Sequence, residues 1–171
     1  MDDACLHLIQ ANKPFRIQCD ACDLAVGGVL EQQNAAGEWR PCWFCSSKLT
    51  ETQVRWDVRE KEAYAIIRAL TKWQQYIGTS PVDLLSDHRT LESWYKEAVE
   101  IQGGPTSRRG RWHLTFSLFN VTVQYLPGVL NGSADALSRW AYLGAGDDDL
   151  TIHGTAEDAQ AIADEKREIA P

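Results

Sequence analysis

The stretch from Gln124 to Trp140 (QYLPGVLNGSADALSRW) combines a strand end, a turn and the start of a helix. The apolar strand ends at Tyr125, and a Pro-Gly turn at 127–128 follows it. Asn131-Gly-Ser133 then leads into a short helix in which Asp135 stands among alanines and a leucine. A carboxylate with apolar neighbours is costly to ionise unless its charge is compensated. A metal ion would compensate it, and so would backbone hydrogen bonds at a helix start.

Length and composition indicate one globular domain. The chain has 171 residues, 44% of them hydrophobic and seven of them Trp, which is enough to bury a core without disulfides or metals. No run of 18 apolar residues occurs, so we expect no membrane span. The N-terminus lacks the basic start and apolar core of a signal peptide. We therefore expect an intracellular protein, cytoplasmic or nuclear, whose five Cys are thiols.

The net charge of −7 is concentrated in the C-terminal tail. From Asp147 onward, eight acids stand against two bases, a net of −6 that leaves −1 for residues 1–146. The total charge therefore does not exclude a polyanionic partner such as nucleic acid.

Hydrophobic periodicity predicts an α/β (α+β) domain with the element order βββαβααβα. The chain divides into a leader of residues 1–13 that could form a short helix, a domain at 14–140, and an acidic extension at 141–171 that could include a helix at 155–169. Within the domain, strands are expected at 15–20, 24–30, 39–46, 82–86 and 121–125, and helices at 57–76, 90–99, 107–116 and 133–138.

Four carboxylates stand where these elements would present chemistry. Asp20 closes the first strand, Asp87 follows the fourth, and Asp135 lies in the last helix. Glu62 falls on the apolar stripe of the long helix, where a buried acid normally requires a partner for its charge. Carboxylate oxygens gathered in one cleft suit Mg²⁺ or Mn²⁺, and two such ions would activate water and stabilise a leaving oxygen. The alternative is that each acid is solvated or caps a helix, as Asp87 could before Thr90.

Several phrases of the sequence closely resemble the ribonuclease H domain of gypsy-type LTR retrotransposon polyproteins. They are QCDAC at 18–22, SSKLTE at 46–51, REKEAYAIIRAL at 59–70, LSDHRTL at 85–91, RRGRW at 108–112, and the YLPG and ADALSR phrases at 125–128 and 134–139. The resemblance covers residues 14–140. It implies a five-stranded mixed sheet flanked by helices and hydrolysis of the RNA strand of an RNA–DNA hybrid. It also places metal-binding acids at Asp20, Glu62, Asp87 and Asp135, with two Mg²⁺ or Mn²⁺ ions per site.

The same resemblance bears on two candidate substrate contacts. Many ribonucleases H carry a mobile His ten residues before the last Asp, where this chain has Tyr125. The gypsy-type branch tends to share that Tyr, so the role of the missing His stays unassigned. Arg89, two residues after Asp87, stands where these enzymes often contact substrate.

Two further clusters have alternative explanations. Arg108, Arg109 and Arg111 form the densest basic cluster, which could follow a phosphate backbone or be a solvated helix start with Trp112 in the core. Two CxxC pairs, at 19–22 and 42–45, have zinc-ribbon spacing. Each pair lies in or at the end of a predicted strand, where positions i and i+3 face opposite sides, so buried thiols are the preferred interpretation.

Two functional alternatives accompany the nuclease. A retrotransposon fragment recruited as a structural subunit of a larger assembly would have the same sequence features without needing catalysis. The chain could also be a segment of a longer polyprotein, with a polymerase domain before it.

Overall fold

The computed structural model describes residues 7–11, 13–89, 91, 96, 103–127 and 131–143. For residues 140–143 it describes the backbone without the side chains. The helix predicted at 90–99 lies largely outside these residues, and the one predicted at 155–169 lies wholly outside them. Residues 7–10 of the leader have no regular secondary structure, and the His7 N–H donates to the Pro41 carbonyl at 2.8 Å. No helix in the described ranges is long and apolar enough to cross a bilayer.

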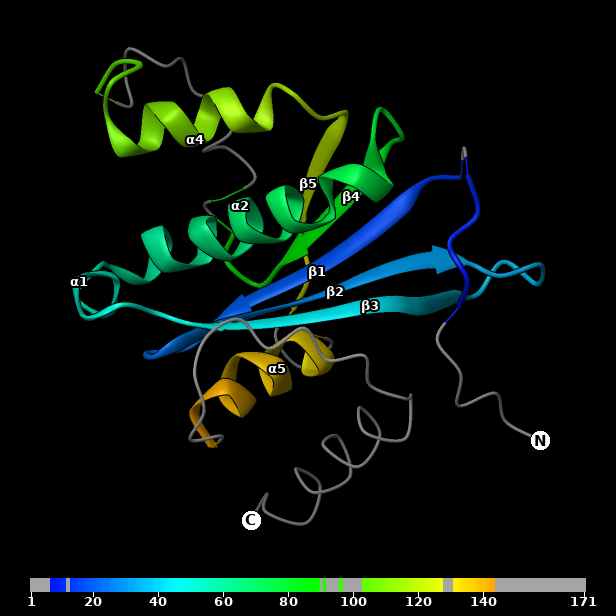
Figure 1. The fold of residues 1–171 in the computed structure, drawn as a ribbon, viewed down its shortest axis with the longest axis horizontal. Coiled ribbons are helices and arrows are strands. Elements are labelled where there is room, and N and C mark those ends of the chain that lie inside the picture. Colours follow the sequence, from blue (N-terminus) through cyan, green and yellow to red (C-terminus); the bar gives the residue numbers. More distant parts are fainter. Residues whose placement is uncertain are drawn as a thin grey trace.

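A five-stranded mixed sheet forms the centre of the molecule, in the order β3-β2-β1-β4-β5 (Figure 1). Strands β1 to β3 pair antiparallel, whereas β4 and β5 run parallel to β1. The sheet confirms the predicted fold class. Its strands are β1 (Phe15–Ala21), β2 (Ala25–Gln33), β3 (Trp39–Lys48), β4 (Val82–Ser86) and β5 (Val121–Tyr125).

Helices cover both faces of this sheet. Helix α2 (Val58–Ile77) crosses one face, and α5 (Gly132–Leu143) packs on the other against β1, β2 and β3 (Figure 1). Helix α4 (Arg108–Phe116) lies beside α2. The short helix α1 (Glu51–Val54) precedes α2 in the chain. Each face of the sheet is therefore buried by a different helix.

Helix α2 begins and ends at residues whose chemistry sets those limits. The Asp57 side chain caps the start by accepting from the Glu60 N–H at 3.0 Å. Gly78 ends it with a φ of 53°, a backbone conformation that glycine adopts without strain. Between them, Ile66, Leu70 and Trp73 are buried against the sheet. The helix thus holds its N-terminal turns, which carry Glu62, at a fixed height above β1.

Helix α5 is longer than predicted and is fastened closely to the sheet. It continues to Leu143, beyond the expected end at Ser138, because no Gly or Pro interrupts the sequence before Gly144. The Ser46 hydroxyl donates to the Leu137 carbonyl at 2.6 Å, and the Asn131 amide donates to the Cys19 carbonyl at 3.0 Å. These bonds fix the helix that carries Asp135.

Candidate active site

Three of the four predicted acids converge at one edge of the sheet. Asp20 lies near the end of β1 and Asp87 directly follows β4, and because these strands are parallel their carboxyl ends meet. Glu62 reaches the same place from the second turn of α2. One carboxylate oxygen from each residue lies within 4.8 Å of the others.

Burial makes these charges costly. Glu62 is only 4% exposed, and its burial, with the charges of Asp20 and Asp87, raises its pKa to about 9 against a weaker opposing hydrogen bond at Ala21. Burial also raises the pKa of Asp20, although a hydrogen bond from Ser138 opposes the rise. The site therefore favours protonation or an added positive charge over three bare carboxylates.

A divalent cation fits this donor set. Among the described residues, Glu62 Oε2 is a buried oxygen with no hydrogen-bond partner, and such an atom normally has one. Hard carboxylate oxygens are the ligands of Mg²⁺ and Mn²⁺, and a cation would compensate the mutual repulsion of the three acids. Asp87 is the most exposed of the three, so the site has a side open to solvent.

Asp135 stands apart from this trio in its contacts. In the described part of the chain, the acid cluster comprises Asp20, Glu62 and Asp87 without it. Asp135 is close enough to Asp20 that its negative charge contributes to raising the pKa of Asp20. Its carboxylate accepts a 2.8 Å hydrogen bond from Arg139 Nε, one turn further along α5.

The predicted substrate contacts Arg89 and Tyr125 lie together beside the acids. Ser86 and Tyr125 are paired at the ends of the parallel strands β4 and β5. The Arg89 guanidinium carbon lies 4.5 Å from the centre of the Tyr125 ring, which is a cation–π contact. A cation and an aromatic face therefore stand together at the edge that carries Asp87.

The basic cluster of α4 is engaged with α2 in this structure. Arg108 forms an ion pair with Glu60 and stacks on Trp56, with 4.0 Å from its guanidinium carbon to the ring centre. Arg109 forms ion pairs with Glu60 and, at 3.8 Å, with Asp57. These contacts attach the start of α4 to the start of α2.

Arg111 and Trp112 lie on different sides of α4. Arg111 donates to the Thr106 carbonyl, and the residue is exposed. Trp112 is 9% exposed and packs edge-on against Trp56, with ring centres 5.7 Å apart. Of the three arginines, Arg111 therefore has the most exposed position.

Two residues near the site had no predicted role. The hydroxyl of Ser138, fully buried, donates to Asp20 Oδ2 at 2.6 Å. Lys61 is 6% exposed and donates to the Asp23 carbonyl at 3.0 Å, which fixes the β1–β2 turn. Only the position of Ser138 inside the phrase ADALSR pointed to it, since its bond joins residues 118 apart.

The first CxxC pair points to opposite sides of the sheet. The Cys19 thiol donates to the Ala65 carbonyl of α2 at 3.8 Å, whereas the Cys22 thiol donates to the Ser138 carbonyl of α5 at 3.1 Å. Burial raises the pKa of the Cys19 thiol well above its ordinary value, so the neutral form is favoured. These contacts agree with the interpretation of Cys19 as a buried thiol.

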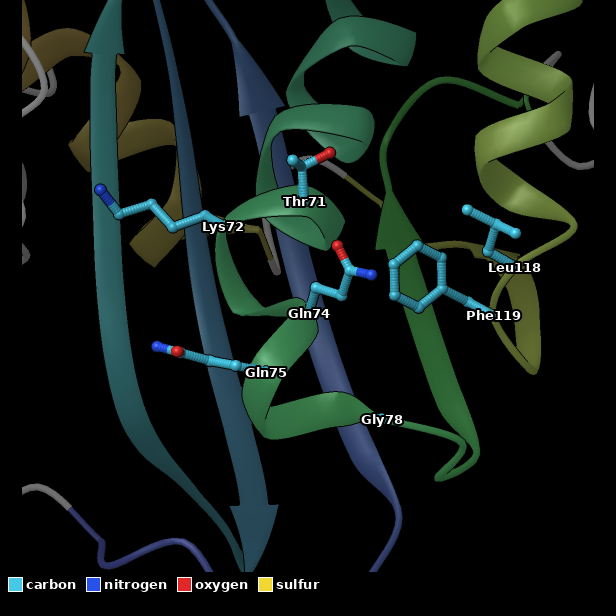
Figure 2. A pocket seen from close by; sticks show the side chains of 7 residues that line it. All are labelled: Thr71, Lys72, Gln74, Gln75, Gly78, Leu118 and Phe119. Carbon is cyan, nitrogen blue, oxygen red and sulfur yellow. The ribbon is translucent and has the colours of Figure 1, made fainter.

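A separate hollow lies between the C-terminal half of α2 and the segment joining α4 to β5 (Figure 2). It has a volume of about 580 Å³, and Gln74, Gln75, Leu118 and Phe119 are among its lining residues. None of the described residues that line it is a carboxylate, so this lining differs in chemistry from the acid cluster.

The mixed five-stranded sheet, covered by helices on both faces and carrying acids at the meeting point of β1 and β4, has the ribonuclease H-like fold. The chain belongs to the family described as the RNase H-like domain found in reverse transcriptase, whose model matches residues 10–119. This confirms the predicted resemblance.

Relatives of similar sequence include transposon polyproteins. The Tf2-3 polyprotein of Schizosaccharomyces pombe is 35% identical over 131 residues, which is 75% of this chain. The chain spans about 10% of the length of that polyprotein.

Solved structures support the fold. LC9-RNase H1 superposes with a TM-score of 0.64 at 12% identity, covering 90% of this chain and 86% of that one. RNase H1 from Halobacterium salinarum gives 0.54 at 16% identity, covering 75% and 97%. A foamy viral protease-reverse transcriptase, solved in complex with an RNA/DNA hybrid, gives 0.53 at 19% identity and covers 71% of this chain and 16% of that one.

Proposed function

We propose that this chain is a divalent-metal-dependent ribonuclease H that hydrolyses the RNA strand of an RNA–DNA hybrid as part of a retrotransposon polyprotein. The observation that carries the proposal is the convergence of Asp20, Glu62 and Asp87 within 4.8 Å, with a buried Glu62 oxygen that lacks a partner. Membership in a family of RNase H-like domains found in reverse transcriptase supports the substrate class.

The positions of the four acids suggest which ion each would bind. Asp20, Glu62 and Asp87 would hold one Mg²⁺ or Mn²⁺, and Asp135, beside Asp20, would help hold a second ion. Bound ions of this kind activate water and stabilise the leaving oxygen of a phosphodiester. Ser138 keeps Asp20 in one orientation through its 2.6 Å hydrogen bond, so less ordering remains to be done when ions bind.

The hybrid would approach from the open side of this cluster. Arg89, paired with the Tyr125 ring, is placed to attract a backbone phosphate near Asp87. The structural relative bound to an RNA/DNA hybrid is a reverse transcriptase, which supports the same class of ligand. Arg111 is an exposed cation that could extend the contact, whereas Arg108 and Arg109 also serve the α2–α4 packing.

The test is Mg²⁺-dependent cleavage of a labelled RNA–DNA hybrid by this chain. Asp87→Asn should lower the rate by more than about 100-fold, because even residues behind metal ligands contribute about 10- to 100-fold. The matched control is Glu38→Gln, an exposed acid in the β2–β3 hairpin, which should cleave at the native rate. A native rate for Asp87→Asn would refute the proposed site.

The alternative of a recruited structural subunit has one supporting observation. Leu8, in the leader, is 85% exposed, which would suit burial by a neighbouring domain. The same exposure suits a domain inside a polyprotein, and clustered buried carboxylates destabilise a purely structural part. An inactive wild-type chain that binds no Mn²⁺ would favour this alternative.

A further inference from the structure

Helix α5 carries three polar side chains at positions i, i+3 and i+4 beside the acid cluster. They are Asp135, Ser138 and Arg139, and this spacing places them on one face of a helix. Ser138 donates to Asp20, and Arg139 donates to Asp135. The helix therefore supplies one acid of the site and the partners of two.

The two partners act differently on their acids. Ser138 is a neutral donor that orients Asp20 and leaves its charge available. Arg139 is a cation, and its ion pair neutralises Asp135 and occupies Oδ1, one of its two oxygens. Within the described ranges, Asp135 is the one acid of the four with a salt bridge to a basic side chain. The Arg139 guanidinium thus occupies a carboxylate oxygen that Asp135 would need to bind a metal ion.

The Arg139–Asp135 ion pair is accessible to solvent and can be broken by a competing anion. The Arg139 side chain is 67% exposed, and that of Asp135 is 29% exposed. Exposed pairs at i, i+4 on a helix are weak, because water and salt compete with them. A polyanion arriving at the open side would compete for the same guanidinium, since arginine binds phosphate oxygens with the same paired donors that it offers to carboxylates.

We propose that Arg139 holds Asp135 when nucleic acid is absent and moves to a backbone phosphate when the hybrid binds, which frees Asp135 to complete the second cation site. The inference rests on the proposed function, because it assumes a hybrid substrate and two ions. Arg139 is on this account a positioning residue. It couples occupancy of the second ion to the presence of substrate.

The first test measures ion binding without nucleic acid. Wild type and Arg139→Ala are titrated with Mn²⁺, and free Mn²⁺ is followed by electron paramagnetic resonance. We expect one strong ion in both proteins and a second, weaker ion that binds about two- to five-fold more tightly in Arg139→Ala, since a competing pair and a nearby positive charge are removed. Arg40→Ala is the matched control, because Arg40 also forms an exposed ion pair, with Glu38 in the β2–β3 hairpin. It should match wild type.

The second test measures the phosphate contact in a background that does not cleave. Affinity for the hybrid is measured against salt concentration for Asp87→Asn and for Asp87→Asn/Arg139→Ala. Loss of one phosphate contact should reduce the slope of log K against log salt by about 0.9. An unchanged slope would overturn the transfer of Arg139 to phosphate.

The outcomes separate the inference from the proposed function. If wild type binds Mn²⁺ and Arg139→Ala has the same second affinity, the inference is wrong and the metal site stands. If wild type binds no Mn²⁺, the proposed function fails first. Arg139→Lys adds a check, because a single ammonium keeps the charge but not the guanidinium geometry. It should fall between wild type and Arg139→Ala in the second affinity.

Discussion

At the scale of single residues, Glu62 has the least favourable surroundings for a charge. It is 4% exposed, Asp20 and Asp87 lie beside it, and its pKa is raised to about 9 from an ordinary 4.5. The folded state thus keeps the proton that the unfolded state releases. In the metal-free protein, the contribution of Glu62 to the free energy of unfolding is therefore greatest below pH 4.5 and decreases as the pH rises towards 9.

Glu62→Gln should consequently stabilise the metal-free protein at pH 8. The expected gain is on the order of 2 kcal/mol, since each unit of pKa shift is worth about 1.4 kcal/mol and the buried amide still lacks a partner. Urea unfolding in EDTA between pH 5 and 8 measures it. Some pH dependence should remain, because burial also raises the pKa of Asp20. Glu51→Gln, at an exposed acid of α1, is the control. Equal stability of Glu62→Gln and wild type at pH 8 would contradict this account.

Residue contacts differ in how far the sequence predicts them. The burial of Glu62 followed from its place on the apolar stripe of α2, and the structure confirms it. The partner of Arg108 could not be predicted, because Glu60 lies 48 positions away and ion pairs have no periodicity. The roles of the acids stay predictions, since geometry alone does not test catalysis.

At the scale of elements, the seating of α5 on β2 depends on Gly27. A Cβ at this position would lie 2.5 Å from the Ser138 nitrogen and 2.7 Å from the Ala134 carbonyl oxygen, both backbone atoms that cannot swing away. Gly27→Ala should therefore displace α5 and cost about 1–3 kcal/mol. Because α5 carries Asp135 and Ser138, cleavage should fall by more than stability alone explains, as urea unfolding and single-turnover rates would measure.

The neighbouring glycine supplies the control for that prediction. A Cβ at Gly28 would meet the Cys45 sulfur at 3.2 Å and Trp73 at 3.4 Å, on the α2 side of the sheet. Gly28→Ala should destabilise without moving α5, so its cleavage rate in the folded protein should stay near native. Equal loss of activity in both variants would show that α5 seating is not the cause.

The α2–α4 contact gives a second prediction at this scale. Arg108→Ala removes an ion pair with Glu60 and the stacking on Trp56. It should lower the free energy of unfolding by about 1 kcal/mol, since a partly exposed cation–π contact and ion pair are each worth about 0.5–1. Arg111→Ala, in an exposed position, should leave stability unchanged. If the two variants unfold alike, the structural role given to Arg108 is wrong.

Element boundaries were predicted best where the local signal was strong. Strands at 82–86 and 121–125 are found as expected. The end of α5 was placed too early, at Ser138, although the sequence has no Gly or Pro to interrupt the helix before Gly144.

At the scale of the whole molecule, strand order could not be obtained from periodicity. The pattern predicts five strands, but the parallel pairings of β4 with β1 and of β5 with β4 join segments far apart in the chain. The mixed sheet followed from the family resemblance instead. Net charge was similarly uninformative, because the tail beyond residue 146 supplies −6 of the −7.

Metal binding should stabilise the whole domain, because the acid cluster joins three parts of the fold. Asp20 comes from β1, Glu62 from α2 and Asp87 from the end of β4, so a shared ion opposes their separation. An ion that binds only the folded state at about 100 times its Kd adds about 2.7 kcal/mol. Thermal unfolding should shift upward when EDTA is replaced by Mg²⁺, and most of the shift should vanish in Asp87→Asn. NaCl at equal ionic strength separates binding from charge screening, since screening would act on both proteins alike. A full Mg²⁺ shift in Asp87→Asn would place the ion elsewhere, whereas its loss would tie the stability of the fold to the cluster that we propose performs the chemistry.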